Sequence, residues 1–126
     1  MERPEDYKSI TELNISWRGL TELPSWVSEC KKLKKLHCDS NNITRLDNLP
    51  QGLKKLCCQY NQITHLDNLP QKLKELYCYN NKITHLDYLP LSKLKVLVCV
   101  NNPLKYDFKP TLENIKNYIN HNTKIN

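Results

Sequence analysis

The chain has 126 residues, and its nineteen lysines and arginines against thirteen acidic residues give it a formal net charge of +6. This length fits one domain, residues 1–126, and leaves no room for a second catalytic module. No apolar run reaches the length of a membrane span, and the N-terminus lacks the apolar segment of a secretory signal. We therefore expect a cytoplasmic protein, neither secreted nor membrane-bound, whose six cysteines stay reduced.

Residues 1–31 are predicted to form an N-terminal cap and an atypical first repeat. Apolar residues recur at intervals between Ile10 and Leu23. The stretch that follows, 24–31, predicts one or two helical turns packed inward. These turns should close the end of the core, because an end repeat otherwise exposes its leucines. The inward side chains are Trp26, Val27 and Cys30.

Residues 32–106 contain four regular units that follow one another in steps of 20, 20 and 21 residues. Each unit reads Leu-x-x-Leu-x-Cys-x-x-Asn-x-Ile or a close variant, as in LKKLCCQYNQI at 53–63. The first three units continue to a Leu-Pro pair. A fixed period of this kind indicates a solenoid, in which each unit packs only on its neighbours.

The repeat also predicts the local structure of each unit. A strand of about three residues points alternate side chains to opposite faces, so the second leucine and the cysteine should both face the core. Stacked strands then form a parallel sheet. A unit of this length is too short for a full return helix, so the opposite side should be extended or 3₁₀. The inward residues are Leu36, Cys38, Leu56, Cys58, Leu76, Cys78, Leu97 and Cys99.

One asparagine in each unit stands where the chain turns away from the strand. A buried amide at this point satisfies backbone groups of adjacent turns. The repeat therefore predicts a ladder of asparagines through the interior. Its members are Asn41, Asn61, Asn81 and Asn102.

Residues 107–126 are predicted to form a C-terminal capping helix and a tail. Between Thr111 and His121, apolar residues recur at helical spacing after Pro110, and a tail begins at Asn122. Such a helix covers the leucines of the last repeat. Its apolar residues are Leu112, Ile115, Tyr118 and Ile119.

The pattern Leu-x-x-Leu-x-Leu-x-x-Asn-x-Leu, with cysteine at the third apolar position, resembles the leucine-rich-repeat family over about residues 10–106. The short LDNLPxxLKxLxC units are similar to those of giant DNA viruses of the mimivirus type, and more distantly to the LPxxL repeats of bacterial effectors. The resemblance implies a right-handed leucine-rich-repeat solenoid of about five units with a concave parallel sheet. The resemblance also implies protein binding. If the protein is viral, we expect it in the cytoplasm of the host cell. The effectors add a ligase domain that has no counterpart here.

The outward side chains of the concave sheet form the expected partner-binding surface. They change along the solenoid from charged to aromatic to apolar, and exposed apolar patches mark contact sites. We expect a protein partner, or a second copy of the chain through the apolar end or the free edge of the last strand. The alternative for the apolar end is that the loop 105–108 covers it. The surface comprises Lys35, His37, Asp39, Lys55, Cys57, Gln59, Glu75, Tyr77, Tyr79, Val96, Val98 and Val100.

Two alternatives to a binding surface involve chemistry. Cys57 is predicted to be exposed on the concave face beside His37, and this couple is a candidate nucleophile with Asp39 as the orienting group. No oxyanion donor accompanies it, so we expect no enzyme activity. His65 and His85, stacked on the convex side, are too few ligands for a metal site. We expect no metal or cofactor, and we expect the buried cysteine column to pack as thiols without disulfides.

A row of lysines provides the alternative function. Lys34, Lys54, Lys74 and Lys95 recur at one position and should form a ridge that attracts nucleic acid or another polyanion. Few aromatic residues interleave with the ridge, although single-stranded nucleic acid favours them. The favoured function is therefore non-enzymatic protein binding through the concave face, and the alternative is polyanion binding by the basic surface.

Overall fold

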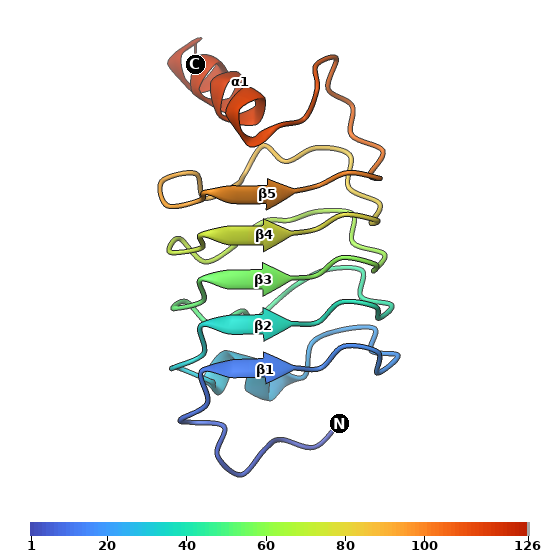
Figure 1. The fold of residues 1–126 in the computed structure, drawn as a ribbon, viewed down its shortest axis with the longest axis vertical. Helices are drawn as coiled ribbons and strands as arrows, with labels where there is room; N and C mark the ends of the chain where they lie inside the picture. Colours follow the sequence, from blue (N-terminus) through green and yellow to red (C-terminus); the bar gives the residue numbers. More distant parts are fainter. Residues whose placement is uncertain (126) are drawn as a thin grey trace.

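The computed structural model describes the backbone of residues 1–125 and the side chains of residues 1–122. Its centre is a five-stranded parallel sheet whose strands follow one another in chain order, each forming one rung of a β-solenoid (Figure 1). This confirms the parallel solenoid with three-residue strands that the repeat predicts. The strands are β1 (Glu12–Asn14), β2 (Lys35–His37), β3 (Lys55–Cys57), β4 (Glu75–Tyr77) and β5 (Val96–Val98).

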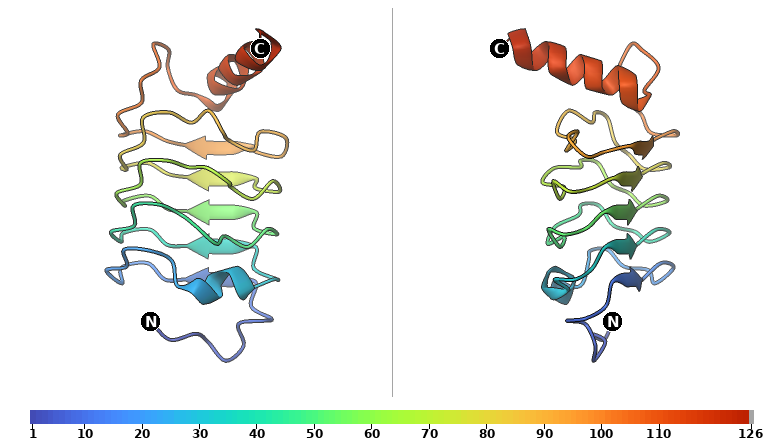
Figure 2. Two further views of the ribbon diagram at one scale, coloured as in Figure 1. Left: turned by 180° about the vertical axis from the view of Figure 1, so that it is seen from behind. Right: turned by 60° about the vertical axis from the view of Figure 1, so that its left-hand side comes forward.

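All five strands pair in the same register. The central leucine of each strand lies beside the central leucine of the next, so that Leu56 is paired with Leu36 on one side and Leu76 on the other. Because side chains alternate along a strand, this register places every inward residue in a continuous column. The return segments run behind the sheet (Figure 2), and the inward columns form the hydrophobic core.

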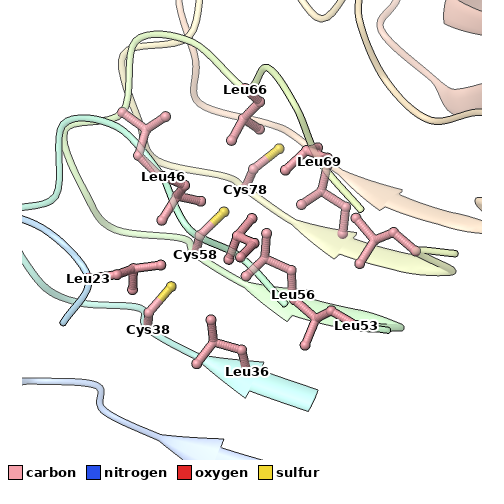
Figure 3. Close-up of a cluster of buried hydrophobic side chains, with 14 of the residues drawn as sticks. Leu23, Leu36, Cys38, Leu46, Leu53, Leu56, Cys58, Leu66, Leu69 and Cys78 are labelled. Carbon is pink, nitrogen blue, oxygen red and sulfur yellow. The ribbon is translucent and has the colours of Figure 1, made fainter. Parts of the chain in front are cut away.

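The core consists of these columns, as predicted. Leu36, Leu56 and Leu76 are fully buried, and the thiols of Cys38, Cys58 and Cys78 form a parallel column beside them (Figure 3). Each thiol occupies the place of a small hydrophobic side chain. Leu97 of β5 is only partly buried against the core.

Both ends of the solenoid are covered. At the N-terminal end a 3₁₀ helix, η1 (Ser25–Glu29), and the residue after it bury the three predicted side chains, Trp26, Val27 and Cys30. At the other end α1 (Leu112–Ile125) lies beyond β5 and buries Ile115 fully (Figure 1).

The start of helix α1 agrees with the sequence prediction to within one residue, whereas its end does not. Its first turn is capped by Thr111, whose Oγ1 accepts a hydrogen bond from the backbone amide of Asn114 (3.1 Å). Its end at Ile125 lies beyond the expected end at His121, and Asn126 of the expected tail lies outside the described residues. None of the helices described within residues 1–125 has the length and apolar character needed to cross a membrane.

The asparagine ladder forms as predicted and joins consecutive rungs. The Nδ2 of Asn61 donates hydrogen bonds to the carbonyl oxygens of Cys38 and Cys58, both at 3.1 Å. Its Oδ1 accepts a hydrogen bond from the amide of Ile43 at 2.9 Å. One buried side chain therefore satisfies backbone groups of two rungs, which otherwise lose their hydrogen bonds to water. The same pattern recurs at Asn41, Asn81 and Asn102.

Replacement of Asn61 by alanine should lower the free energy of unfolding by about 1–3 kcal/mol, because the backbone groups that it satisfies stay buried without partners. Gln62 is the matched control, since it is adjacent and exposed, and Gln62→Ala should leave stability within about 0.5 kcal/mol. Urea denaturation of both variants measures the difference. Equal losses at the two positions would contradict the ladder.

Candidate functional site

The solvent side of the sheet, called the sheet face below, carries three rows of side chains that run across the rungs. The first two rows follow from the strand register. The third continues beyond the strands, where the backbone ladder of hydrogen bonds extends from Ser40 to Gln59, from Tyr60 to Tyr79 and from Asn80 to Val100. The structure thus brings together all twelve residues predicted for the surface. The rows are Lys35, Lys55, Glu75 and Val96; His37, Cys57, Tyr77 and Val98; and Asp39, Gln59, Tyr79 and Val100.

The N-terminal part of the sheet face is polar and paired. His37 lies between Asn14 and Cys57 in the strand register. Its Nε2 is 2.9 Å from the Oε2 of Glu12, a contact that joins β1 and β2 at a partly exposed position. An exposed pair of this kind contributes little to stability, so its main effect is to hold the imidazole in place.

The middle of the sheet face is aromatic, and its rings are held by their neighbours. The hydroxyl of Tyr77 donates to Glu75 at 2.9 Å, and Lys55 places its ammonium 5.5 Å from the centre of the Tyr77 ring. The hydrogen bond to Glu75 is the main cause that raises the pKa of Tyr77 above its ordinary value. The ring of Tyr79 meets that of Tyr60 edge to face at 5.5 Å. Rings held in this way lose little conformational entropy when a partner binds.

The apolar end of the sheet face stays open, and the alternative that the loop 105–108 covers it is wrong. Tyr106 instead turns toward the return segment of the preceding rung. Its hydroxyl donates to Asp87 and accepts from the amide of Leu86, both at 2.6 Å. These two hydrogen bonds anchor Tyr106 to the return segment. Val100 is consequently 57% exposed, and Val96 and Val98 are half-buried.

The prediction that Cys57 is exposed is wrong. Its side chain is on the sheet face but is only 7% exposed. In the register it lies between the larger side chains of His37 and Tyr77, with Lys55 on the same face, and a small thiol between larger neighbours is covered. Burial is the main cause that raises the pKa of Cys57 above its ordinary value, although the charge of Lys55 acts in the opposite direction. At neutral pH the group is therefore a protonated thiol.

The residues of both chemical alternatives are neighbours in the structure. His37 stands next to Cys57, but its Nε2 is paired with Glu12, and Asp39 accepts a hydrogen bond from Ser40 (3.2 Å). Asp39 therefore does not orient the imidazole. The rings of His65 and His85 lie 6.2 Å apart. Among the described side chains, no group of three or more potential ligands is arranged to hold a metal ion.

Two aromatic residues at one edge of the sheet face were not predicted as part of the site. Trp17 is 81% exposed and Tyr60 is 53% exposed, and a hollow of about 560 Å³ lies between them, lined also by Ser40, Asn41 and Asn42. Both have a left-handed backbone, with φ of 58° and 57°. The corresponding residues of the other rungs, Ser40, Asn80 and Asn101, share this conformation.

The residue types in this left-handed column are the signal that would have revealed the aromatic pair. Asparagine adopts positive φ readily, whereas a bulky aromatic residue does so at a cost. Backbone geometry therefore explains Asn80 and Asn101 but not Trp17 and Tyr60. Since Tyr60 contacts Tyr79, the aromatic part of the sheet face extends over the carboxyl-terminal edge of the strands.

Comparison with known proteins leaves the site to be interpreted from its own geometry. No family model and no curated protein matches the chain. The structure offers a polar, aromatic and apolar sheet face, an aromatic edge at Trp17 and Tyr60, and a lysine ridge at the opposite edge, where Lys34, Lys54, Lys74 and Lys95 each precede a strand.

The native protein should react slowly with a bulky maleimide at all of its cysteines. All six are buried and free, and burial raises the pKa of Cys57, Cys58 and Cys99, so both exposure and thiolate fraction are low. Mass spectrometry after labelling in buffer and in urea measures this. Six labels should appear only in urea. Rapid single labelling of native protein at Cys57 would contradict its burial.

Replacement of Trp17 by asparagine should raise the free energy of unfolding by about 1 kcal/mol, because asparagine relieves the strain of a bulky residue at positive φ. Trp17→Leu is the control, since it removes the ring but keeps the strain, and it should bring no such gain. Thermal and urea denaturation of both variants provide the measurement. Destabilisation by Trp17→Asn would mean that the exposed ring stabilises the fold.

Proposed function

We propose that the chain is a right-handed leucine-rich-repeat scaffold that binds a protein partner, without catalysis, through the sheet face. The parallel solenoid, the asparagine ladder and the period of the leucines support the family assignment. A right-handed crossover between parallel strands is the general rule, which supports the handedness.

The exposure of the apolar end of the sheet face carries the proposal. Val100 is 57% exposed, and Val96 and Val98 are half-buried although loop 105–108 is near enough in the chain to have covered them. Tyr77 and Tyr79 lie beside them in the same rows. Rigid aromatic rings next to a dry aliphatic patch are the composition of an interface hot spot.

The rest of the surface supports a role for charge in association. Lys35, Lys55 and His37 lie on β2 and β3, on the N-terminal side of the apolar patch and separated from it by β4, and the net charge of the chain is +6. Positive charge around an apolar centre accelerates association with an acidic partner, although it adds less to affinity than the centre does. The aromatic edge at Trp17 and Tyr60 enlarges the same contact surface.

The double variant Tyr77→Ala with Val98→Asp should weaken partner binding by about tenfold or more, because it removes one hot-spot ring and places a charge in the apolar centre. The partner is captured on immobilised protein from an extract of the source cell, identified by mass spectrometry and titrated against each variant. Sedimentation at rising protein concentration tests a second copy of the chain as the partner. Denaturation curves verify that the variants fold.

Two controls make the outcome specific. Tyr88→Ala removes an exposed tyrosine from the return side (69% exposed) and should leave binding unchanged. Charge reversal at Lys54 and Lys74 should weaken binding about twofold to fivefold, as expected for peripheral charges. If the lysine variant abolishes binding and the double variant binds normally, the partner uses the lysine ridge and the proposal is wrong.

A further inference from the structure

The third regular unit, residues 73–93, departs from the period of the repeat at one point. It contains one residue more than the preceding units, within Leu91-Ser92-Lys93. The turn before β5 accordingly spans three residues, 91–93, whereas the corresponding turns before β3 and β4 span two. Figure 1 shows the result as a wider loop at the amino-terminal end of β5. The extra residue thus widens one edge of the sheet.

A hollow lies at this widened edge. Its volume is about 540 Å³, and five lysines and one serine line it. Backbone hydrogen bonds from Lys74 to Lys54 and from Lys95 to Lys74 place three of the lysines in consecutive rungs. The other two belong to the turns before β4 and β5. The lining residues are Lys54, Lys72, Lys74, Ser92, Lys93 and Lys95.

The lysines of the hollow repel one another, and none of them has an acidic partner within the part of the chain that the structure describes. No carboxylate lines the hollow, and among the described side chains the ion pairs involve His37 and Arg45 but none of these lysines. The charge of Lys74 is the largest cause that lowers the pKa of Lys54, followed by desolvation and by the charges of Lys34, Lys72 and Lys93. A surface built for solubility alone mixes both signs of charge, whereas this one concentrates a single sign.

We propose that the hollow at the amino-terminal edge of β4 and β5 binds a small anion that carries several phosphate groups. Its volume is within the range of small-molecule sites, about 300–1,000 Å³. The row from Lys54 to Lys95 covers two rung spacings, or about 10 Å, which matches clustered phosphates and is short for a nucleic-acid backbone. Lysine ammonium groups are point-charge ligands for phosphate, and the hydroxyl of Ser92 adds a donor. This site shares no residue with the sheet face, although Lys54 and Lys74 also act as peripheral charges in the proposed protein binding.

Isothermal titration with inositol hexakisphosphate and with tripolyphosphate tests the proposal. Both should bind the full chain at low salt and raise its melting temperature, and binding should weaken as salt rises. Orthophosphate should bind at least about tenfold more weakly, since it offers one phosphate to five lysines. The absence of heat and of a melting shift with both polyphosphates would overturn the proposal.

A matched pair of double variants separates the hollow from net charge. Lys72→Gln with Lys93→Gln should weaken inositol hexakisphosphate binding by about tenfold or more. Lys82→Gln with Lys105→Gln removes the same charge from exposed positions outside the hollow and should change binding less than about twofold. If the two double variants weaken inositol hexakisphosphate binding equally, the effect comes from net charge alone and the proposed site is wrong.

Deletion of Ser92 tests the origin of the hollow. It returns the turn before β5 to the length of the other turns and keeps every lysine. Binding should fall by about as much as in the Lys72 and Lys93 double variant, while urea denaturation confirms folding. Unchanged binding by a folded deletion variant would overturn the role of the wider turn.

Two further probes distinguish the sources of the phosphate groups. Vesicles of phosphatidylcholine with phosphatidylinositol bisphosphate should retain the protein, and soluble inositol hexakisphosphate should reverse this retention. Retention that the soluble anion does not reverse would contradict a small-anion site. A single-stranded oligonucleotide should bind more weakly than inositol hexakisphosphate. Tighter oligonucleotide binding with a steeper salt dependence would assign the lysines to nucleic acid and overturn the proposal.

Discussion

The fold depends on one recurring problem, which is how to satisfy backbone groups that the narrow solenoid buries at every turn. Asn61 solves it for the rungs of β2 and β3, since its amide donates to a carbonyl of each and accepts from the return segment of the earlier rung. A rung on its own has neither these partners nor a buried leucine column. A single rung is therefore not stable alone, and the rungs at both ends of the stack need a covering segment.

This dependence on neighbours also determines where the molecule can present a binding surface. Inward positions carry the leucines, cysteines and asparagines, and the return segments carry the Leu-Pro pairs, so neither varies freely among the regular units. The outward side chains of the strands contribute to neither the core nor the return segments, so they can vary from rung to rung. They change from the His37–Glu12 pair through Tyr77 to Val100 over five rungs, while the backbone beneath them keeps one register.

The features that the sequence predicts well are those that recur with the period of the repeat. The strands, the leucine and cysteine columns and the asparagine ladder all have one position per unit, so four units report on the same environment. The burial of Cys57 was not predictable in this way, because it depends on the size of His37 and Tyr77 in the adjacent rungs. The path of Tyr106 depends on its two partners at the return side, and no second copy of that segment exists in the chain.

In the candidate surfaces too, the features that recur in every unit were predicted and those that occur in single units were not. All twelve predicted sheet-face residues lie in the expected rows, since alternation along a strand is sufficient to place them. Trp17 and Tyr60 were missed because they lie after the strands, at positions of positive φ that the periodic pattern of apolar residues does not report. The lysine hollow was missed as a cavity because Ser92 and Lys93 of its lining belong to the longer turn at residues 91–93, which departs from the period of the regular units.

The common register of the rungs has a consequence for how such a protein changes over generations. Since one period of the coding sequence corresponds to one rung, a recombination event that gains or loses a whole period leaves Leu56 or its equivalent facing another leucine. The interior tolerates the exchange, and the two end covers, η1 and α1, keep their own contacts. The sheet face can thus be lengthened, shortened or given a new row of side chains in a single genetic step, without a new core.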